Sequence, residues 1–279
     1  MKRVGLLTAA VVLSAFSARA IIIRHDVPDA KYKVDAKEFP QLADLPGSGE
    51  GVLVSPVWVV TVARAVAGKD VSEVVINGVP RAVARVVIHP GYTPAHPEME
   101  RGDAAPLMLF ERDVDDIAML ELKEPVTDVL PVAMYRGNEE QSEVAEIFGK
   151  GMTGDGLHGE DANSPRRGEL RRAYTRVEQA NGRWITLQFH SKREAQPLEG
   201  MPGDGDEGGP VLIKVHGTWA LAGLVSRKYA VGDLSTYMFF HYGNETYVTR
   251  ISHYSPWIDS VMVNDTAEPA AAADSPTAP

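Results

Sequence analysis

A glycine-rich turn in the last third of the chain carries three carboxylates, Asp204, Asp206 and Glu207, within four residues. Oxygen ligands at this density could hold a calcium ion. The calcium loop of an EF-hand, however, needs an acid where Gly208 stands and a glutamate where Val215 stands. We therefore expect no metal in this turn, and no other segment of the sequence indicates a cofactor.

The same turn, Gly203–Pro210, resembles the nucleophile loop Gly-Asp-Ser-Gly-Gly-Pro of trypsin- and chymotrypsin-like serine proteases, with Glu207 in place of the serine. A second segment, Trp58–Val66, resembles the family's Trp-Val-Leu-Thr-Ala-Ala-His-Cys-Val and carries Arg64 where the general-base histidine stands. The resemblance therefore implies the family's fold together with the loss of two residues that its chemistry needs.

The acid is the triad member that survives. Asp115–Leu120 resembles the family's Asp-Ile-Ala-Leu-Leu segment and retains the acid at Asp116. The chain order of base, acid and nucleophile is kept as Arg64, Asp116 and Glu207, as in chymotrypsin. Two further kinds of position follow from the resemblance. They are an oxyanion-hole donor at Gly205 and substrate-cleft residues at Met201, Ser226 and Arg227.

Matches to the family continue from about Ile21 to about Met262. The additional segments are Val87–Tyr92, Phe148–Gly151, Ala222–Ser226 and Tyr247–Ile258. The resemblance implies an all-β, chymotrypsin-like fold of two antiparallel Greek-key β-barrels with a C-terminal α-helix. It also places the site in the crevice between the barrels.

The hydrophobic pattern by itself also favours β-structure. Short runs rich in β-branched residues alternate with Gly- and Pro-bearing turns, which is typical of a sandwich or barrel. These runs cover residues 51–60, 74–76, 83–88, 117–122, 144–148, 184–189, 211–215 and 219–225. Only the end predicts a helix, with Ser255 as N-cap, Pro256 at the first helical position, and Trp257, Ile258 and Val261 on one face.

The chain is expected to divide at about residue 131. We expect an N-terminal barrel over about 21–131, a C-terminal barrel over about 132–251 and a helix over about 255–262. Each barrel of about 110 residues is within the normal size of a domain. The tail 263–279 is rich in Ala, Pro and acidic residues, and we expect it to be disordered.

The first twenty residues have the pattern of a secretory signal peptide. Met1-Lys2-Arg3 precedes an apolar run from Val4 to Phe16, and Ala18-Arg19-Ala20 provides a small-x-small cleavage site. The apolar run is shorter than the roughly 20 residues of a membrane span. We therefore expect an exported protein, periplasmic or secreted, with no stable membrane anchor after cleavage.

Cleavage after Ala20 would make Ile21 the new N-terminus. Activated members of the resembled family start with Ile-Val or Ile-Ile, and their α-ammonium pairs with the aspartate before the catalytic serine, here Asp206. The resemblance thus implies an activation pair of Ile21 and Asp206. Because Ile23-Arg24 departs from the family's Gly-Gly, the alternative is that residues 21–23 are simply a surface strand.

Charge and cysteine content narrow the class of partner. The formal net charge is −10, and removal of the signal segment makes it more negative. An acidic protein is repelled by the phosphate backbone of a nucleic acid, so we expect no nucleic-acid partner. The chain has no cysteine, so its stability must come from packing rather than from disulfides. The partner class that we expect is a peptide or protein ligand.

The replaced residues argue against serine-protease chemistry. Arg64 cannot act as a general base because arginine stays protonated. The Glu207 carboxylate could attack a peptide carbonyl, but the tetrahedral adduct would expel the carboxylate, a far better leaving group than the amine, so the attack would mostly reverse. Removal of triad members lowers the turnover of serine proteases by about 10⁶-fold. We therefore predict no serine peptidase turnover.

The two replacements conserve charge. An aspartate, a neutral histidine and a serine carry one net negative charge, as do Asp116, protonated Arg64 and Glu207. We therefore expect Arg64 to bridge Asp116 and Glu207 through the paired donors of its guanidinium. The alternative is that both replaced side chains point into solvent.

Three interpretations of function stay open. The first is an exported pseudoprotease that binds peptide or protein through its cleft, or through acidic insertions around residues 93–113 and 153–168. The second is a serine-type endopeptidase with residual or altered activity. The third is a disabled or engineered copy with no function. Peptide binding without cleavage would separate the first from the third.

Overall fold

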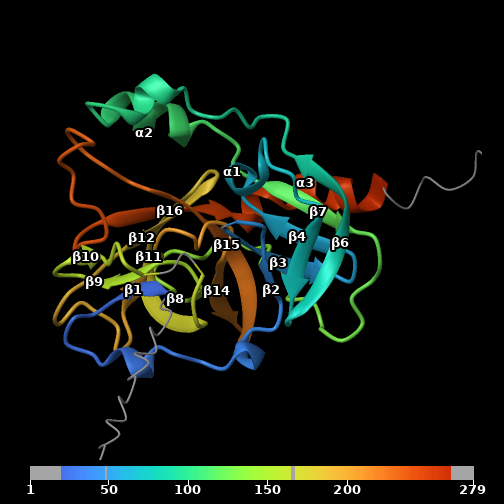
Figure 1. Ribbon diagram of the computed structural model, residues 1–279, viewed down its shortest axis with the longest axis horizontal. Helices are drawn as coiled ribbons and strands as arrows, with labels where there is room; N and C mark the ends of the chain where they lie inside the picture. Colours follow the sequence, from blue (N-terminus) through green and yellow to red (C-terminus); the bar gives the residue numbers. More distant parts are fainter. Residues whose placement is uncertain (1–19, 48, 165–166, 265–279) are drawn as a thin grey trace, which may run out of the picture.

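The computed structural model describes residues 20–47, 49–164 and 167–264. The predicted signal segment, apart from Ala20, and the tail from residue 265 therefore lie outside the described residues. Two closed antiparallel β-barrels lie next to each other, and a helix, α3 (Ile251–Asn264), follows the last strand (Figure 1). The predicted fold class of two antiparallel barrels with a C-terminal helix is confirmed.

The first barrel closes in the order β2-β3-β4-β7-β6-β5. Its strands are β2 (Leu42–Asp44), β3 (Glu50–Ser55), β4 (Trp58–Thr61), β5 (Glu73–Ile76), β6 (Val79–Ile88) and β7 (Ala118–Leu122). Pairing of Ala43 with Ile76 joins β2 to β5 and completes the barrel. The run expected over 51–60 is two strands, because Pro56 lies at the turn and has no N–H to donate to a ladder.

The second barrel closes in the order β11-β12-β16-β15-β14-β8. Its strands are β8 (Val144–Gly149), β11 (Arg171–Asn181), β12 (Trp184–Gln188), β14 (Pro210–Val215), β15 (Thr218–Lys228) and β16 (Glu245–Arg250). The pattern of apolar runs does not predict β11, because this strand is mostly charged or polar. Its alternating burial, with Ala173 and Val177 buried, is nevertheless that of a strand with one face on a core.

The N-terminal segment packs on the second barrel, so the expected boundary of 21–131 for the first barrel is wrong at its start. β1 (Ile21–Ile23) lies in a four-stranded sheet with β9 (Thr153–Asp155), β10 (Gly159–Glu160) and β13 (Gly200–Met201). All three isoleucines are buried in the uncut chain. The fully buried Arg171 of β11 binds both carboxylate oxygens of Asp29, at 2.9 and 3.1 Å.

The C-terminal helix begins earlier than its sequence signals predicted. α3 starts at Ile251, directly after β16, because Ile251, Tyr254 and Ile258 recur at helical spacing and are all buried. Ser255 is therefore not an N-cap, and its hydroxyl donates to the carbonyl oxygen of Ile251 at 3.1 Å. Pro256 lies inside the helix rather than at its first position.

Short helical segments interrupt the loops, and the sequence pattern did not predict them. They are η1 (Asp29–Lys31), η2 (Ala36–Glu38), α1 (Ala63–Val66), η3 (Pro97–Glu100) and α2 (Ala105–Arg112). α1 follows β4 directly, whereas η3 and α2 belong to the long connection between β6 and β7. α2 stands out from the barrels at the top of Figure 1.

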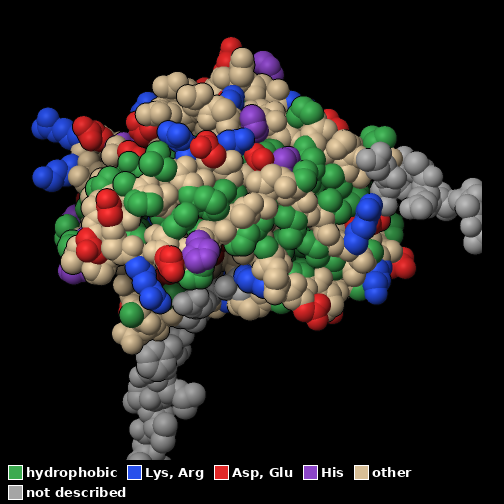
Figure 2. Space-filling view, turned by 90° about the horizontal axis from the view of Figure 1, so that it is seen from above, with side chains coloured by type: hydrophobic (Ala, Val, Ile, Leu, Met, Phe, Trp, Pro, Cys, Tyr) green, Lys and Arg blue, Asp and Glu red, His purple; other side chains and the backbone are tan. Residues whose placement is uncertain are grey.

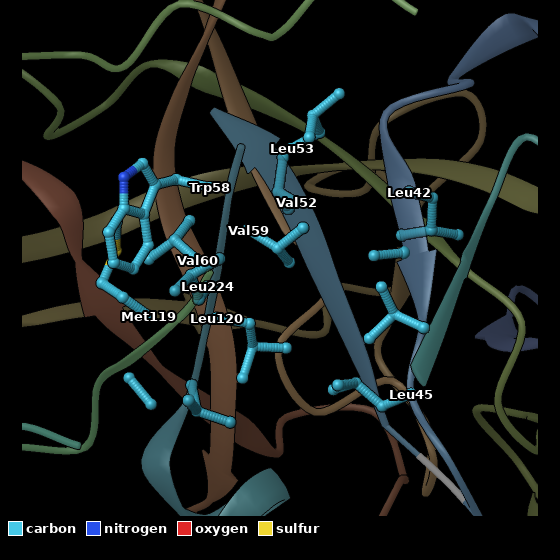
Figure 3. Packing of buried hydrophobic residues seen from close by; sticks show 14 of the residues in the cluster. Leu42, Leu45, Val52, Leu53, Trp58, Val59, Val60, Met119, Leu120 and Leu224 are labelled. Atoms are coloured by element: carbon cyan, nitrogen blue, oxygen red, sulfur yellow. The ribbon is translucent and has the colours of Figure 1, made fainter. Parts of the chain in front are cut away.

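One hydrophobic cluster crosses the interface between the barrels. Leu53, Trp58 and Leu120 of the first barrel belong to the same buried cluster as Leu224 of β15 (Figure 3). The loops at this interface are therefore anchored on two barrels that pack against each other, and the barrels can position the side chains of the site. Within the described part of the chain, every helix is too short or too polar to cross a membrane.

Candidate functional site

Both barrels contribute side chains to the crevice at the predicted triad positions. Arg64 lies in α1 directly after β4, and Asp116 directly precedes β7. Glu207 lies in the turn between β13 and β14, whereas Ser226 and Arg227 lie near the end of β15. The structure brings all five of these residues to one place, although it does not pair them as the sequence suggested.

Asp116 is the buried centre of the site, with no exposed surface. One carboxylate oxygen accepts from the backbone N–H of Arg64 at 2.9 Å, and the other accepts from the Ser226 hydroxyl at 2.7 Å. The Nε atom of Arg64 lies 3.0 Å from the same second oxygen. Two hydrogen-bond donors and an arginine thus surround this buried carboxylate, which satisfies the requirement that a buried charge be paired.

The Arg64 guanidinium bridges two carboxylates, but Glu207 is not one of them. Its Nη2 atom lies 2.6 Å from Oε1 of Glu111, while its Nε atom faces Asp116. Among the described residues, no ion pair joins Arg64 to Glu207, so the expected bridge is wrong in its second half. Burial lowers the pKa of Arg64, but the charges of Asp116 and Glu111 more than offset this and raise the pKa above its usual value.

Arg227 is a second arginine in the same cluster. Its Nη1 atom donates to the backbone carbonyl of Glu111 at 2.9 Å, and its Nε atom donates to the Ser226 hydroxyl at 3.2 Å. Its Nη2 atom lies 3.4 Å from Asp116, and its guanidinium lies over the ring of Trp184 at 4.6 Å. Burial, together with the nearby charge of Arg64, lowers the pKa of Arg227. Two arginines and two carboxylates thus form a charge-balanced cluster, which we call the arginine cluster (Arg64, Glu111, Asp116, Arg227).

Glu111 is the member of the cluster that sequence reasoning missed. It belongs to α2, inside the acidic insertion around residues 93–113, for which no family motif gave a counterpart. It is the one buried residue of α2, and it is only 7% exposed. The indole N–H of Trp184 donates to the carbonyl of Arg112 at 2.8 Å and so fixes the C-terminal end of the helix beside the cluster. A buried acid on an otherwise exposed helix is not visible in a composition or motif search.

The Glu207 side chain turns back into its own loop. Its Oε2 atom accepts from the backbone N–H of Gly205 at 3.0 Å, which is the predicted oxyanion-hole donor. The backbone carbonyl of Glu207 accepts from Glu50 N–H at 2.7 Å and ties the loop to the first barrel. The amide that would have to stabilise a negatively charged intermediate therefore already donates its hydrogen bond to a carboxylate.

An open hollow lies in front of Glu207. Its volume is about 290 Å³, and its lining includes Arg64, Lys69, Asp204, Gly205 and Glu207. Viewed from the side of α2, the surface of the molecule shows acidic and basic side chains interspersed with hydrophobic ones (Figure 2). The hollow gives solvent access to Arg64, whose side chain is 30% exposed.

The space beside the nucleophile position is nearly filled by the chain itself. Lys228 pairs with Asp204 at 2.6 Å, and its ammonium lies 4.5 Å from the ring of Phe240. The remaining cavity is about 40 Å³, and Ser226 and Arg227 line it. Met201 is not in this lining. It is buried in a hydrophobic cluster with Ile22, Phe189 and Phe240, of which Phe240 lines the cavity, so the assignment of Met201 to the substrate cleft stays a prediction.

Asp206 points away from the crevice into the protein. Its carboxylate accepts from the backbone N–H groups of Gly151 at 2.6 Å and of Gly203 at 2.8 Å. A Cβ atom at Gly149 or at Gly151 would clash with this carboxylate. Burial raises the pKa of Asp206 to about 7.

The predicted activation pair concerns a chain that has been cut after Ala20. In the uncut chain Ile21 is a buried member of β1, and its carbonyl accepts from the Thr153 hydroxyl at 2.7 Å. Its nitrogen belongs to a peptide bond with Ala20 and carries no charge. The pairing of Ile21 with Asp206 therefore stays a prediction for the processed protein.

Comparisons with known proteins agree on one family. The family model described as Trypsin matches residues 31–258. Vitamin K-dependent protein C of Oryctolagus cuniculus is 26% identical over 208 residues, which are 67% of this chain and 38% of that protein. Vitamin K-dependent protein C of Mus musculus is 23% identical over 233 residues, or 76% of this chain and 45% of that protein. The chain thus spans less than half the length of these curated relatives.

Proposed function

The chain belongs to the trypsin family, and from that premise we propose that it is a catalytically inactive member, a pseudoprotease, that acts by binding peptide or protein. The proposal includes export, to the periplasm or the medium, after removal of residues 1–20. The family supplies the serine-protease domain and its crevice. In that crevice, this chain has the arginine cluster in place of the residues that carry out proteolysis.

The observation that carries this proposal is the pairing of Arg64 with both Asp116 and Glu111, at 3.0 and 2.6 Å. A general base must accept a proton and release it again near the working pH. An arginine between two carboxylates holds its proton more firmly than a free arginine. The position that should take the proton from a nucleophile is therefore occupied by a permanent cation.

Glu207 supports the same conclusion from the other side of the crevice. The predicted oxyanion donor, the Gly205 amide, already donates a hydrogen bond to the Glu207 carboxylate at 3.0 Å. Stabilisation of a developing oxyanion contributes several kcal/mol to acyl transfer, roughly 3–4 for one donor. A fixed negative charge at this place opposes that stabilisation. Base, nucleophile and oxyanion donor are thus all unsuited to acyl transfer.

The binding half of the proposal is supported by the hollow of about 290 Å³ at the same site. It combines side chains of both charges and lies next to the partly exposed Arg64. Such a combination suits a peptide segment better than a small apolar molecule.

The test is peptide-bond cleavage by the exported protein, purified and incubated with a broad peptide mixture and with a labelled denatured casein. We expect no new fragments by mass spectrometry and a rise in the fluorescence anisotropy of the labelled casein. A Glu207→Ala variant and an Arg64→His/Glu207→Ser revertant are measured alongside. Cleavage by the unaltered protein that is lost in Glu207→Ala would establish the alternative, an endopeptidase with altered activity. Neither cleavage nor binding would favour a disabled copy.

A further inference from the structure

The Glu111 carboxylate lies between two arginines that belong to the barrels. Its Oε1 atom is 2.6 Å from Nη2 of Arg64 and 3.5 Å from Nη1 of Arg227. We propose that Arg64 and Arg227 form a binding site for a carboxylate of a peptide ligand, and that Glu111 occupies this site in the free protein. This inference rests on the proposed function and specifies the ligand chemistry of the same crevice.

The charges of the cluster define the ligand class. Asp116 is fully buried and cannot leave without opening the first barrel, so it compensates one of the two arginines permanently. Glu111 compensates the other arginine. If Glu111 is displaced, one positive charge is left uncompensated beside the 3% exposed Arg227 side chain, which strongly favours uptake of another anion. The planar donors of arginine match the two oxygens of a carboxylate, so an acidic peptide is the ligand that suits this site.

α2 can be separated from the barrels more easily than any strand can. Glu111 is its only buried residue, and Leu109 is 57% exposed. Before the helix, the N–H of Ala104 donates to the carbonyl of Gly232 and the N–H of Leu234 donates to the carbonyl of Gly102, both at 2.7 Å. At its end, Trp184 and Arg227 donate to the carbonyls of Arg112 and Glu111 at 2.8 and 2.9 Å. A segment held outside the barrels by a few hydrogen bonds can open without unfolding of the strands.

A ligand can reach Arg64 from solvent, because Arg64 lines the hollow of about 290 Å³. Arg64 and Arg227 both line the smaller cavity of about 40 Å³ beside it. Asp204 and Glu207 lie at this hollow as well, and their charges disfavour a ligand with many negative charges. We therefore expect preference for one carboxylate in a mostly neutral peptide.

The first experiment uses acetate as the probe. Glu111→Ala removes the atoms that acetate replaces, a methylene group and a carboxylate. We expect this variant to melt at a lower temperature than the wild type, and we expect acetate to restore much of the loss. Acetamide and chloride at the same concentration serve as controls and should restore none of it. Equal effects of acetate and chloride would overturn the proposal.

The second experiment covers the case in which Glu111→Ala does not fold. Glu111→Gln keeps the shape of the side chain and removes its charge. Fluorescein-labelled Ala-Ala-Glu-Ala-Ala with a C-terminal amide should bind Glu111→Gln about tenfold or more tightly than the wild type, whereas the same peptide with Gln should not. A third peptide, Ala-Ala-Gln-Ala-Ala with a free C-terminus, shows whether a terminal carboxylate serves instead of a side chain. Glu98→Gln, a change at an exposed acid of η3, is the matched control.

The outcomes separate this inference from the proposed function. Equal binding of all three peptides to Glu111→Gln, or binding that Glu98→Gln raises as much, would overturn the carboxylate site. Such a result leaves the absence of peptidase turnover untouched. Cleavage of the peptides by the wild type would instead refute the proposal of a pseudoprotease, because the crevice beside Glu111 would then contain an active catalytic centre. Carboxylate-selective binding without cleavage supports both the carboxylate site and the proposed pseudoprotease function.

Discussion

Two clusters of buried charge lie at the interface between the barrels, and they are neutralised in different ways. Asp116 lies 3.0 Å from Arg64 and 3.4 Å from Arg227, and Arg64 lies 2.6 Å from a second carboxylate, that of Glu111. Around Asp206, the neighbouring acid is Glu50, which is 1% exposed and has no hydrogen-bond partner for Oε2 among the described residues. Lys150 donates its backbone N–H to Glu50, but its ammonium pairs with Asp44.

The difference between the clusters shows how a buried acid can be tolerated. In the arginine cluster the compensating charges are cations, which join distant segments of the chain. Beside Glu50 the response is a shift in proton affinity. Burial, with the nearby charge of Asp206, raises the pKa of Glu50 well above its usual value, and burial raises the pKa of Asp206 to about 7. We therefore expect the second cluster to respond to pH near neutrality.

The largest effect is expected from breaking the arginine cluster at its centre. Asp116→Ala leaves the buried Arg227 and the partly exposed Arg64 with one carboxylate, and we expect the free energy of unfolding at pH 7 to fall by about 3–5 kcal/mol. Urea-induced unfolding followed by tryptophan fluorescence measures it, with Glu98→Gln as an exposed control. A loss below about 1 kcal/mol would mean that solvent screens the cluster.

A smaller effect, with a pH dependence, is expected at Glu50. The folded chain keeps protons on the raised-pKa acids Glu50 and Asp206 that the unfolded chain has released, so their contribution to stability is greatest below about pH 4 and falls as the pH rises to about 7. Glu50→Gln removes one of the two carboxylates and lets Asp206 ionise more readily. We expect the decline in unfolding free energy between pH 4.5 and 7.5 to shrink by about 1–3 kcal/mol. Parallel pH profiles of the variant and the wild type would contradict this.

The smallest effect is expected at Glu207. Glu207→Ser removes one hydrogen bond from Gly205 to a side chain that is only partly buried. We expect a loss of about 0.5–1.5 kcal/mol in the urea experiment used for Asp116→Ala. A loss as large as that of Asp116→Ala would show that Glu207 does take part in the arginine cluster, and so would restore the bridge expected from the sequence.

The parts of the fold that were predicted are those with local signals. The alternation of β-branched runs and turns located most strands of both barrels, and motif segments placed Arg64, Asp116, Glu207 and Ser226 in one crevice. The signals failed where packing decided the outcome. β11 carries mostly polar residues, and its Arg171 is buried only because Asp29, far away in the sequence, pairs with it. Ser255 and Pro256 form a good local helix start, but burial of Ile251 and Tyr254 extends the helix past them.

Glu111 shows the same limit at the site. Its own segment reads as an acidic, exposed insertion, and only 7% of its surface is exposed because α2 folds back against Arg64 and Arg227. The partners are distant in the sequence, one in each barrel. No local pattern records a contact of this kind, whereas the absence of a histidine and a serine from two short motifs is read directly.

The sequence by itself determined the family, the double barrel and the loss of a proton-accepting base and a hydroxyl nucleophile, because these properties depend on residue type and local pattern. The tertiary structure alone decided which carboxylate pairs with Arg64, and that Glu207 returns to the Gly205 amide. It also decided that Met201 is buried in a hydrophobic cluster with Ile22. The physical reason is that a buried charge takes the partner that folding brings within hydrogen-bonding distance, and for Arg64 that partner lies on a helix from a distant insertion.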